Sequence, residues 1–391
     1  MGAQLARLLR GAWREAPDRI DCHDATVEAC LHAALDGGCG GLLWTRVASS
    51  RPPRALRPLR NAYRHQALDA AVRGAQLAQV VTRLREIDIE PIVLKGWAVA
   101  RLYRDRAHRP YQDLDLLMPA GSASRAAEGL ASDPILRAGV DLHASTQDLP
   151  GRSWVDLVAA SRAAPLPDGG SVRVLGPEDR LRLAALHFWR HRAERPLWLV
   201  DIAVMVECLS SEFDWDRCLT GRRADAFRVQ CAVELAVHLL GARTPLGHSA
   251  PKPVRLPSWV TDAVYRQWAV DRRVPERARD ATAVTLLRQG RVPITRLLRA
   301  RWPGPLVARP RGNWTDHAPR WPLQVGAYIC RAVRASGSLV RAAAQRLHVS
   351  FGRGVEGNKS SSVSRTVRPF RSASRAEVDR VLEATGRSQC R

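Results

Sequence analysis

Two aspartates separated by one residue have the type and spacing that metal chemistry needs. Asp113 and Asp115 flank Leu114 in a short apolar run, residues 114–118, that has the pattern of a β-strand. Side chains at i and i+2 of a strand share one face, so the two carboxylates are expected to point the same way. Carboxylate oxygens suit Mg²⁺, and two such ions about 3.5–4 Å apart can clamp the attacking and leaving oxygens of a phosphoryl displacement. Alternating acids also occur in any half-exposed strand, so a purely structural interpretation stays open.

A third carboxylate and a phosphate-binding turn are expected close to this pair. Val140 to His143 repeats the pattern of an acid between core residues, so Asp141 is expected to face the same site from a neighbouring strand. Gly96 stands where a strand turns into a helix, and such turns offer free backbone N–H groups and a helix dipole to phosphate. Lys95 precedes this glycine and is the only lysine in the first 250 residues.

Two histidines form a second candidate group. His187 and His191 lie four residues apart, which places them on one face of a helix, and Asp201 is expected to approach from the next helix. A histidine pair with a carboxylate can bind a metal ion or relay protons. Histidines in such positions are more often ordinary core or surface residues, so both interpretations stay open.

Helical patterns surround these residues on both sides. Apolar spacing and end signals predict helices over residues 24–35, 59–87, 97–103, 122–131, 178–193, 196–208 and 224–240. Short apolar runs predict strands over residues 91–94, 114–118, 137–143 and 172–175. The expected fold class is therefore α+β, with a small mixed sheet flanked by N-terminal and C-terminal helical regions.

The expected domain boundaries follow these changes of pattern. An N-terminal helical region is expected over residues 1–88, an α/β core over residues 89–176, and a C-terminal helical region over residues 177–287. Residues 288–351 are rich in Arg and Pro, and residues 352–391, rich in Ser, Gly and Arg, are expected to be a largely disordered tail.

The composition describes a basic globular chain. The 391 residues carry a formal net charge of +23, and the hydrophobic fraction of 46% excludes a wholly disordered chain. Only three of the basic residues are lysines, a skew that indicates coding bias, so the charge alone is weak evidence for nucleic-acid binding. The charge does predict attraction to polyanions, phosphorylated ligands and acidic membrane surfaces.

The cysteines and the apolar segments indicate the compartment. The eight cysteines contain no Cys-x-x-Cys pair and are expected to be reduced. Residues 1–19 lack the continuous apolar region of an export signal, and the longest apolar stretch, residues 197–206, is far shorter than the ~20 residues of a membrane span. We therefore expect a cytoplasmic protein without a membrane span. Some of these cysteines could alternatively hold zinc, in the cluster Cys22, His23, Cys30, His32 and Cys39, although its spacings match no known zinc module.

Taken in order, the motifs resemble those of a known family. Leu94-Lys95-Gly96, Arg109 with Asp113-Leu-Asp-Leu-Leu117, and Val140-Asp-Leu-His143 are similar to motifs of the uncharacterised nucleotidyltransferase family, within the DNA-polymerase-beta-like superfamily. The resemblance covers roughly residues 40–245. It continues through Leu175-Gly-Pro-Glu-Asp179, the helix of His187 and His191, Trp198 with Asp201, and Leu239-Leu-Gly241.

This resemblance implies a nucleotidyltransferase fold and assigns roles to residues. Asp113 and Asp115 are implied to bind two Mg²⁺ ions and a nucleoside triphosphate (NTP), and Asp141 to assist the attacking hydroxyl and join the metal ligands. The residues expected to contact the NTP are Lys95, Gly96 and Arg109, since a guanidinium forks onto phosphate oxygens. The candidate acceptor pocket consists of His143, His187, His191 and Asp201.

Two functions from different classes are compatible with the sequence. The first is a Mg²⁺-dependent nucleotidyltransferase that moves an NMP from an NTP to an unidentified hydroxyl and releases pyrophosphate. The alternative is a catalytically silent relative that binds nucleic acid through the Arg-rich C-terminal third. The acceptor, the preferred NTP and the oligomeric state are not indicated by the sequence.

Salt dependence separates these functions. Between residues 288 and 351, twelve arginines stand against one acid, Asp316. If this region binds nucleic acid, each neutralised phosphate contributes a slope of about −0.9 for duplex, or about −0.7 for single strands, in log K against log salt. We expect weak nonspecific binding, measured by fluorescence anisotropy, with a slope that flattens when residues 288–391 are removed. Nanomolar affinity for one RNA near physiological salt would contradict this expectation.

Overall fold

A computed structural model describes residues 1–17, 24–47, 54–145, 148–244 and 252–269, and the single residues 306, 322, 325, 326 and 329. All of them belong to one compact unit, residues 1–332. Apart from those single residues, the predicted Arg/Pro-rich region, residues 288–351, and the predicted tail, residues 352–391, lie outside the described residues. The predicted boundaries at residues 88, 176 and 287 stay predictions.

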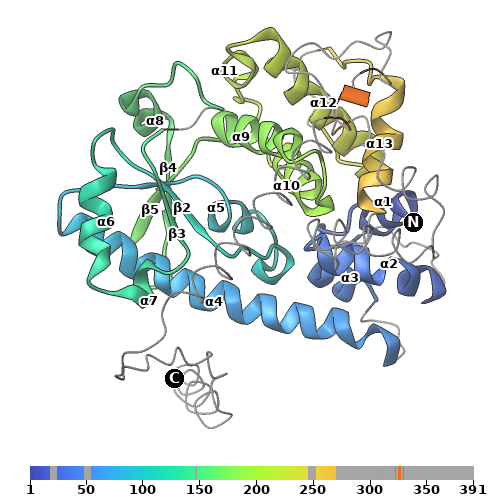
Figure 1. The fold of residues 1–391 in the computed structure, drawn as a ribbon, viewed down its shortest axis with the longest axis horizontal. Coiled ribbons are helices and arrows are strands. Elements are labelled where there is room, and N and C mark those ends of the chain that lie inside the picture. Colours follow the sequence, from blue (N-terminus) through green and yellow to red (C-terminus); the bar gives the residue numbers. More distant parts are fainter. Residues whose placement is uncertain are drawn as a thin grey trace, which may run out of the picture. The chain divides into compact units, whose positions relative to one another are not determined.

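A mixed sheet forms the centre of the part that carries the paired acids (Figure 1). Its strands are β1 (Ile92–Val93), β2 (Leu114–Leu117), β3 (Val140–His143), β4 (Arg162–Pro165) and β5 (Ser171–Val174), in the spatial order β3-β2-β1-β5-β4. The pairs β2–β3 and β1–β5 are parallel, whereas β1–β2 and β4–β5 are antiparallel. The expected α+β fold with helical flanks is confirmed.

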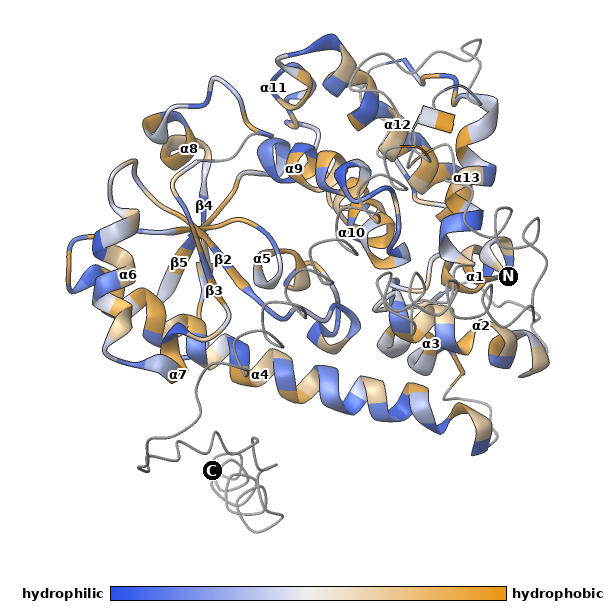
Figure 2. Ribbon diagram, in the orientation of Figure 1, coloured by the Kyte–Doolittle hydropathy of each residue, from blue (hydrophilic) through white to orange (hydrophobic). Residues whose placement is uncertain are grey.

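Each face of the sheet packs against helices because apolar side chains alternate along the strands. Leu114 and Leu116 of β2 belong to a buried cluster with residues of α4 (Arg57–Arg85) and α6 (Ala123–Ala131). On the opposite face, Leu117 packs in a cluster with Leu157 of α8 (Trp154–Ala160) and Leu183 of α9 (Pro177–Arg190). Figure 2 shows hydrophobic residues along the strands and alternating hydrophobic and hydrophilic residues along α4. Asp115 lies on the second face, two residues before Leu117.

A larger helical core surrounds the C-terminal part of α9. It joins α1 (Gly2–Leu9), α2 (Asp24–Asp36), α3 (Gly40–Val47), α10 (Pro196–Glu207), α12 (Arg223–Leu240) and α13 (Ser258–Trp268). The short helices are α5 (Trp97–Ala100), α7 (Pro134–Arg137) and α11 (Trp215–Leu219), with 3₁₀ turns at Arg54–Leu56 and Arg106–His108. Gly241 ends α12 in the left-handed region (φ 67°), as helix-ending glycines do. Among the described residues, no helix combines the length and the apolar composition needed to cross a membrane.

The structure differs from the predicted elements at several places, and it contains helices for which no range was predicted: α1, α3, α7, α8, α11 and α13. The predicted strand over residues 137–143 begins only at Val140, because α7 and the positive φ of Gly139 (73°) occupy the preceding residues. The predicted helix over residues 97–103 ends at Ala100. Strand β4 was not predicted, since Arg162 to Pro165 offers only two alanines as its apolar pattern and ends in a proline, which suits an edge strand.

Glu207, the last residue of α10, ties three separate segments together. Its carboxylate accepts hydrogen bonds from Trp13 Nε1 at 3.0 Å, from the Arg14 guanidinium, and from the backbone N–H of Arg243 at 2.8 Å. Burial by itself raises the pKa of Glu207, but these three donors outweigh it and leave the pKa below its ordinary value. The carboxylate therefore stays charged and holds the N-terminal segment against the end of α10.

We expect Glu207→Gln to lower the free energy of unfolding by about 1–3 kcal/mol at pH 7, since it leaves buried donors poorly paired. A carboxyl whose pKa is depressed on folding contributes stability above its unfolded pKa and loses it as pH falls through the folded value. The difference between variant and wild type should therefore shrink below about pH 4.5, as measured by urea unfolding at several pH values. As a control, Glu15→Gln, at a mostly exposed glutamate, should stay within about 0.5 kcal/mol of wild type at every pH. A constant Glu207→Gln difference across pH would contradict the charge-based explanation.

Candidate functional site

The chain turns sharply after β1 and thereby fixes Lys95 beside β2. Leu94 N–H donates to the Asp115 carbonyl oxygen at 3.0 Å, which aligns the end of β1 with the middle of β2. Gly96 follows with a φ of 58°, in the left-handed region that favours glycine, and a Cβ there would lie 3.3 Å from the Asp113 carbonyl oxygen. The turn therefore requires glycine and leads directly into α5.

The parallel pairing of β2 with β3 brings Asp115, Asp141 and His143 together. Asp115 is in register with Asp141, and Leu117 with His143, so the three polar side chains share one face. His143 Nε2 lies 3.2 Å from Asp115 Oδ1 and 3.3 Å from Asp141 Oδ2. Lys95 Nζ lies 3.1 Å from the same Asp115 oxygen. We call Asp115, Asp141 and His143 the acid–histidine cluster.

Asp115 is a fully buried carboxylate that is held in its charged form. Its side chain has 0% exposure. Burial alone raises the pKa of Asp115, but the hydrogen bond from His143 and the charge of Lys95 outweigh it and lower the pKa. The same hydrogen bond raises the pKa of His143 against the opposing effect of burial. The site thus combines a buried negative charge with one ammonium, that of Lys95, and one imidazole, that of His143.

The acid–histidine cluster has the donor set of a divalent metal site. One ligand atom from each of its three residues lies within 4.8 Å of the others. Asp115 Oδ2 is buried and finds no hydrogen-bond partner among the described residues, so this oxygen retains its capacity to bind a cation. Oxygen ligands with one imidazole suit Mg²⁺ or Mn²⁺, although the donors do not fix the ion.

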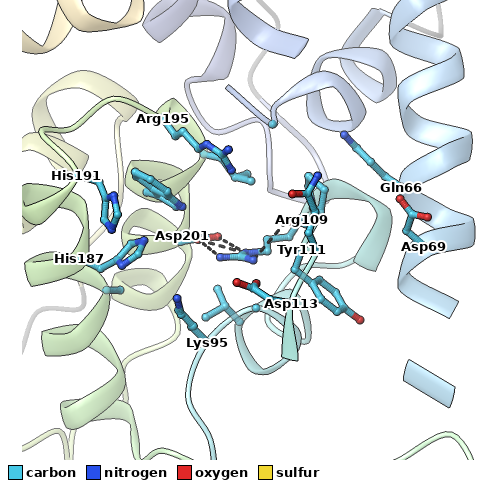
Figure 3. A pocket seen from close by; sticks show the side chains of 18 of the residues that line it. Gln66, Asp69, Lys95, Arg109, Tyr111, Asp113, His187, His191, Arg195 and Asp201 are labelled. Carbon is cyan, nitrogen blue, oxygen red and sulfur yellow. Dashed lines mark hydrogen bonds and ion pairs between the residues drawn. The ribbon is translucent and has the colours of Figure 1, made fainter. Parts of the chain in front are cut away.

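A cavity of about 650 Å³ lies next to this cluster and contains most of the predicted site residues. Figure 3 shows His187 of α9 and His191, which directly follows α9, on one side, Gln66 and Asp69 of α4 on the other, and Lys95, Arg109, Asp113 and Asp201 between them. Gly96 also lines the cavity, whereas the three cluster residues do not. Lys95 therefore connects the cavity with the acid–histidine cluster.

The two aspartates of the predicted pair lie in different environments. Asp113 precedes β2, is exposed and lines the cavity, whereas Asp115 is inside β2 and buried. The acid–histidine cluster joins Asp115 to Asp141 and His143 but does not include Asp113. Binding of one metal centre by Asp113 and Asp115 together stays a prediction. His143 contacts both cluster acids, and its predicted role in the acceptor pocket stays a prediction.

Arg109 and Asp201, predicted for separate roles, form one buried ion pair. Arg109 Nε lies 3.2 Å from each Asp201 oxygen, and its terminal nitrogen lies 2.8 Å from Oδ2. Tyr103 donates its hydroxyl to the same carboxylate at 2.7 Å. Burial lowers the pKa of Arg109, but Asp201 more than offsets this effect and the pKa is raised. The predicted contact of Arg109 with phosphate stays a prediction, since two of its three nitrogens already donate to Asp201.

The histidine pair forms an aromatic wall with Trp198 of α10. The ring centroids of His187 and His191 lie 4.3 Å apart, and those of His187 and Trp198 lie 4.7 Å apart. Arg195 places its guanidinium 5.4 Å from the Trp198 ring. Burial, assisted by the charges of Lys95 and other nearby cations, lowers the pKa of His187 to about 3. His187 is therefore neutral at physiological pH and acts as a hydrogen-bonding ring rather than a cation.

Sequence analysis missed Arg180, another residue of the cavity. Arg180 lines the cavity from the first turns of α9, and its Nε is buried without an acceptor among the described residues. Its spacing of seven residues from His187 places both on one helix face, so helical periodicity contained the signal. The zinc alternative for the cysteine cluster involves Cys22 and His23, which lie outside the described residues.

Comparison with known proteins identifies a family model that matches the chain. A model of the family described as uncharacterised nucleotidyltransferase matches residues 23–134 and 136–245, which is more than half of the chain and includes every candidate site residue. No curated protein matches the chain. Among solved structures, the chain is similar to an antigenic nucleotidyltransferase-like protein from Paracoccidioides brasiliensis, with 16% identity and a TM-score of 0.32. That similarity covers 46% of this chain and 94% of the other.

Breaking the Arg109–Asp201 pair tests whether it is primarily structural. Because each substitution leaves one buried charge unpaired, Arg109→Met and Asp201→Asn should each lower the free energy of unfolding by about 3–5 kcal/mol, as measured by urea denaturation. Tyr103→Phe removes only one hydrogen bond from the same carboxylate and should cost about 1 kcal/mol. Unchanged stability in Arg109→Met would show instead that the guanidinium is held in reserve for a ligand.

Proposed function

Because the chain belongs to the family of uncharacterised nucleotidyltransferases, we propose that it is a divalent-metal-dependent nucleotidyltransferase. It transfers an NMP from an NTP to a hydroxyl acceptor and releases pyrophosphate. The observation that carries this proposal is the position of Lys95, which contacts the buried carboxylate of Asp115 and also lines a cavity of about 650 Å³. A metal site and a space for substrate thus adjoin at one turn of the chain.

The residues that would hold Mg²⁺ are the acidic ones on this side of the sheet. Asp115 and Asp141 offer carboxylate oxygens and His143 an imidazole nitrogen, with Asp113 approaching from the cavity. The buried, unpartnered Oδ2 of Asp115 supports this fit. When bound, divalent ions would neutralise negative charge on the phosphates. Such electrostatic stabilisation is a main requirement of phosphoryl-type transfer.

The residues of the chain itself position the two substrates. Lys95 donates to the triphosphate, and the Gly96 turn lets the backbone approach it. The acceptor oxygen attacks the α-phosphorus, the bond from that phosphorus to the bridging oxygen breaks, and pyrophosphate leaves. Asp141, whose side chain is 60% exposed, orients the acceptor hydroxyl and takes its proton.

The acceptor is held on the aromatic wall in this proposal. His187 and His191 belong to the cavity, together with Trp198 and Asp201. A neutral imidazole donates from one nitrogen and accepts at the other, which suits a hydroxyl-bearing ligand. Asp201 acts indirectly, because it holds Arg109 in the wall of the cavity.

The alternative function concerns a different part of the chain. Binding of nucleic acid through residues 288–351 rests on residues that, apart from a few single positions, lie outside the described ranges. Cytoplasmic localisation and the choice of NTP likewise stay predictions. The described geometry favours the transferase, because it brings together the cavity and the acid–histidine cluster.

Transfer of label distinguishes nucleotidyl transfer from other uses of an NTP. Purified protein is incubated with Mg²⁺, a cell extract and each NTP, labelled at either the α-phosphorus or the γ-phosphorus. The proposal expects a product labelled from the α-position and release of the γ-label in pyrophosphate. A γ-labelled product would indicate a kinase, and no labelled product from any NTP would remove support for transferase activity.

Substitution of the three acids should separate their roles. Asp113→Asn and Asp115→Asn should each lower transfer by about 100-fold or more, the loss typical of removing one electrostatic contact in a transition state. Asp113→Asn should leave the unfolding midpoint unchanged because the side chain is exposed, whereas Asp115→Asn should shift it. Asp141→Asn should lose transfer but still bind NTP, as measured by calorimetry.

A matched control is available in Asp216, an exposed aspartate of α11 outside the cavity. Asp216→Asn makes the same chemical change and should keep wild-type transfer. Wild-type rates in both Asp113→Asn and Asp115→Asn would contradict the metal assignment. Loss of NTP binding in Asp141→Asn would show that this residue acts mainly through the metal ion and not on the acceptor hydroxyl.

A further inference from the structure

The Lys95 ammonium contacts the carboxylate that is expected to bind a metal ion. Its Nζ is 3.1 Å from Asp115 Oδ1, the oxygen that also receives His143 Nε2 at 3.2 Å. Asp115 belongs to the acid–histidine cluster, whose ligand atoms lie within 4.8 Å of one another. A divalent ion bound there would face a positive charge a few ångströms away, so the ion and the ammonium compete for Asp115.

Burial explains why a cation must be present in either state. Asp115 has no exposed surface, and an isolated buried carboxylate is strongly unfavourable unless it is paired. Within the described residues, Lys95 and His143 are its side-chain partners. When the metal is absent, Lys95 therefore supplies the neutralising charge.

Lys95 is also free to leave this position. Its side chain is 33% exposed and lines the cavity, so rotation of its flexible stem carries the ammonium from Asp115 into the substrate space. Arg109 lines the same cavity but holds Asp201 with two of its nitrogens. Of these two cations, Lys95 is the one that can exchange partners without breaking a buried bidentate pair.

We propose that Lys95 is an exchangeable counter-ion, which neutralises Asp115 in the metal-free protein and binds the phosphates of the substrate once a divalent ion has displaced it. This inference rests on the metal site of the proposed function. It makes Lys95 the residue that couples the two ligands, since metal binding releases the ammonium that the anion needs. By linkage, the anion must strengthen metal binding by the same factor.

The first test measures metal affinity without turnover. Mn²⁺ binding is followed by electron paramagnetic resonance in wild type and in Lys95→Met, which keeps an unbranched side chain but removes the charge. Because the competing ammonium is gone, we expect Mn²⁺ to bind about tenfold more tightly, the order expected for removing a partly screened unit charge. The control Lys252→Met makes the same change at an exposed lysine outside the cavity and should leave the affinity unchanged. Equal or weaker binding by Lys95→Met would overturn the exchange.

The second test uses the wild-type protein and its three lysines, Lys95, Lys252 and Lys359. Amines are labelled briefly with acetic anhydride, and the rate at each lysine is read by mass spectrometry, with Lys252 as the internal reference. Saturating Mg²⁺ should raise the relative rate at Lys95, because its nitrogen no longer donates to Asp115. Inorganic tripolyphosphate added with Mg²⁺ should lower it again. A Lys95 rate that does not respond to bound Mg²⁺ would overturn the proposal.

The two tests distinguish failure of the exchange from failure of the proposed function. Asp115→Asn should abolish Mn²⁺ binding in both the wild-type and the Lys95→Met background. If Mn²⁺ binds through Asp115 but neither Lys95 readout changes, the exchange is wrong and the metal site stands. If neither wild type nor Lys95→Met binds Mn²⁺, both the metal site and the exchange are wrong.

Discussion

The burial of one carboxylate, that of Asp115, is the constraint on which the site depends. A buried charge must be neutralised, and the fold supplies two hydrogen-bond donors for it. Lys95 comes from the turn after β1 and His143 from β3. The β1–β2 pairing supplies the first donor and the β2–β3 register supplies the second. Shifting β3 by one residue would turn Asp141 and His143 to the opposite face and leave Asp115 with Lys95 alone.

A second buried aspartate extends the same principle to the helical part of the molecule. Asp201 of α10 holds Arg109, which belongs to the segment leading into β2. The ion pairs Arg109–Asp201 and Asp115–Lys95 thus anchor the two ends of residues 109–115, the first to α10 and the second to the turn after β1. The cavity lies between these anchors, and its walls are correspondingly the turn after β1 and the segment leading into β2 on one side and mainly helices on the others.

Local patterns in the sequence predicted many of the elements and several residues of the cavity, but not the partners of those residues. The i, i+4 spacing of His187 and His191 is a property of one helix, and the structure places both in the cavity. The difference between Asp113 and Asp115 could not be predicted, because alternation identifies a face and says nothing of how deeply that face is covered. His143 bridges two acids only because of a register between strands, and Arg109 meets Asp201 across 92 residues of chain. Such pairings are set by tertiary structure.

The parallel pairing of β1 with β5 has a consequence for the order of events during synthesis. Ile92 pairs with Arg173, and Val93 with Val174, so the centre of the sheet closes only after some eighty intervening residues have been made. The cavity is completed later still, because one of its walls includes Asp201, which is synthesised after β5. Non-local pairings of this kind fold slowly, and chains longer than about 150 residues commonly pass through intermediates. The acids and the lysine are therefore synthesised before the segments that bring them together, and the cavity is completed late in folding.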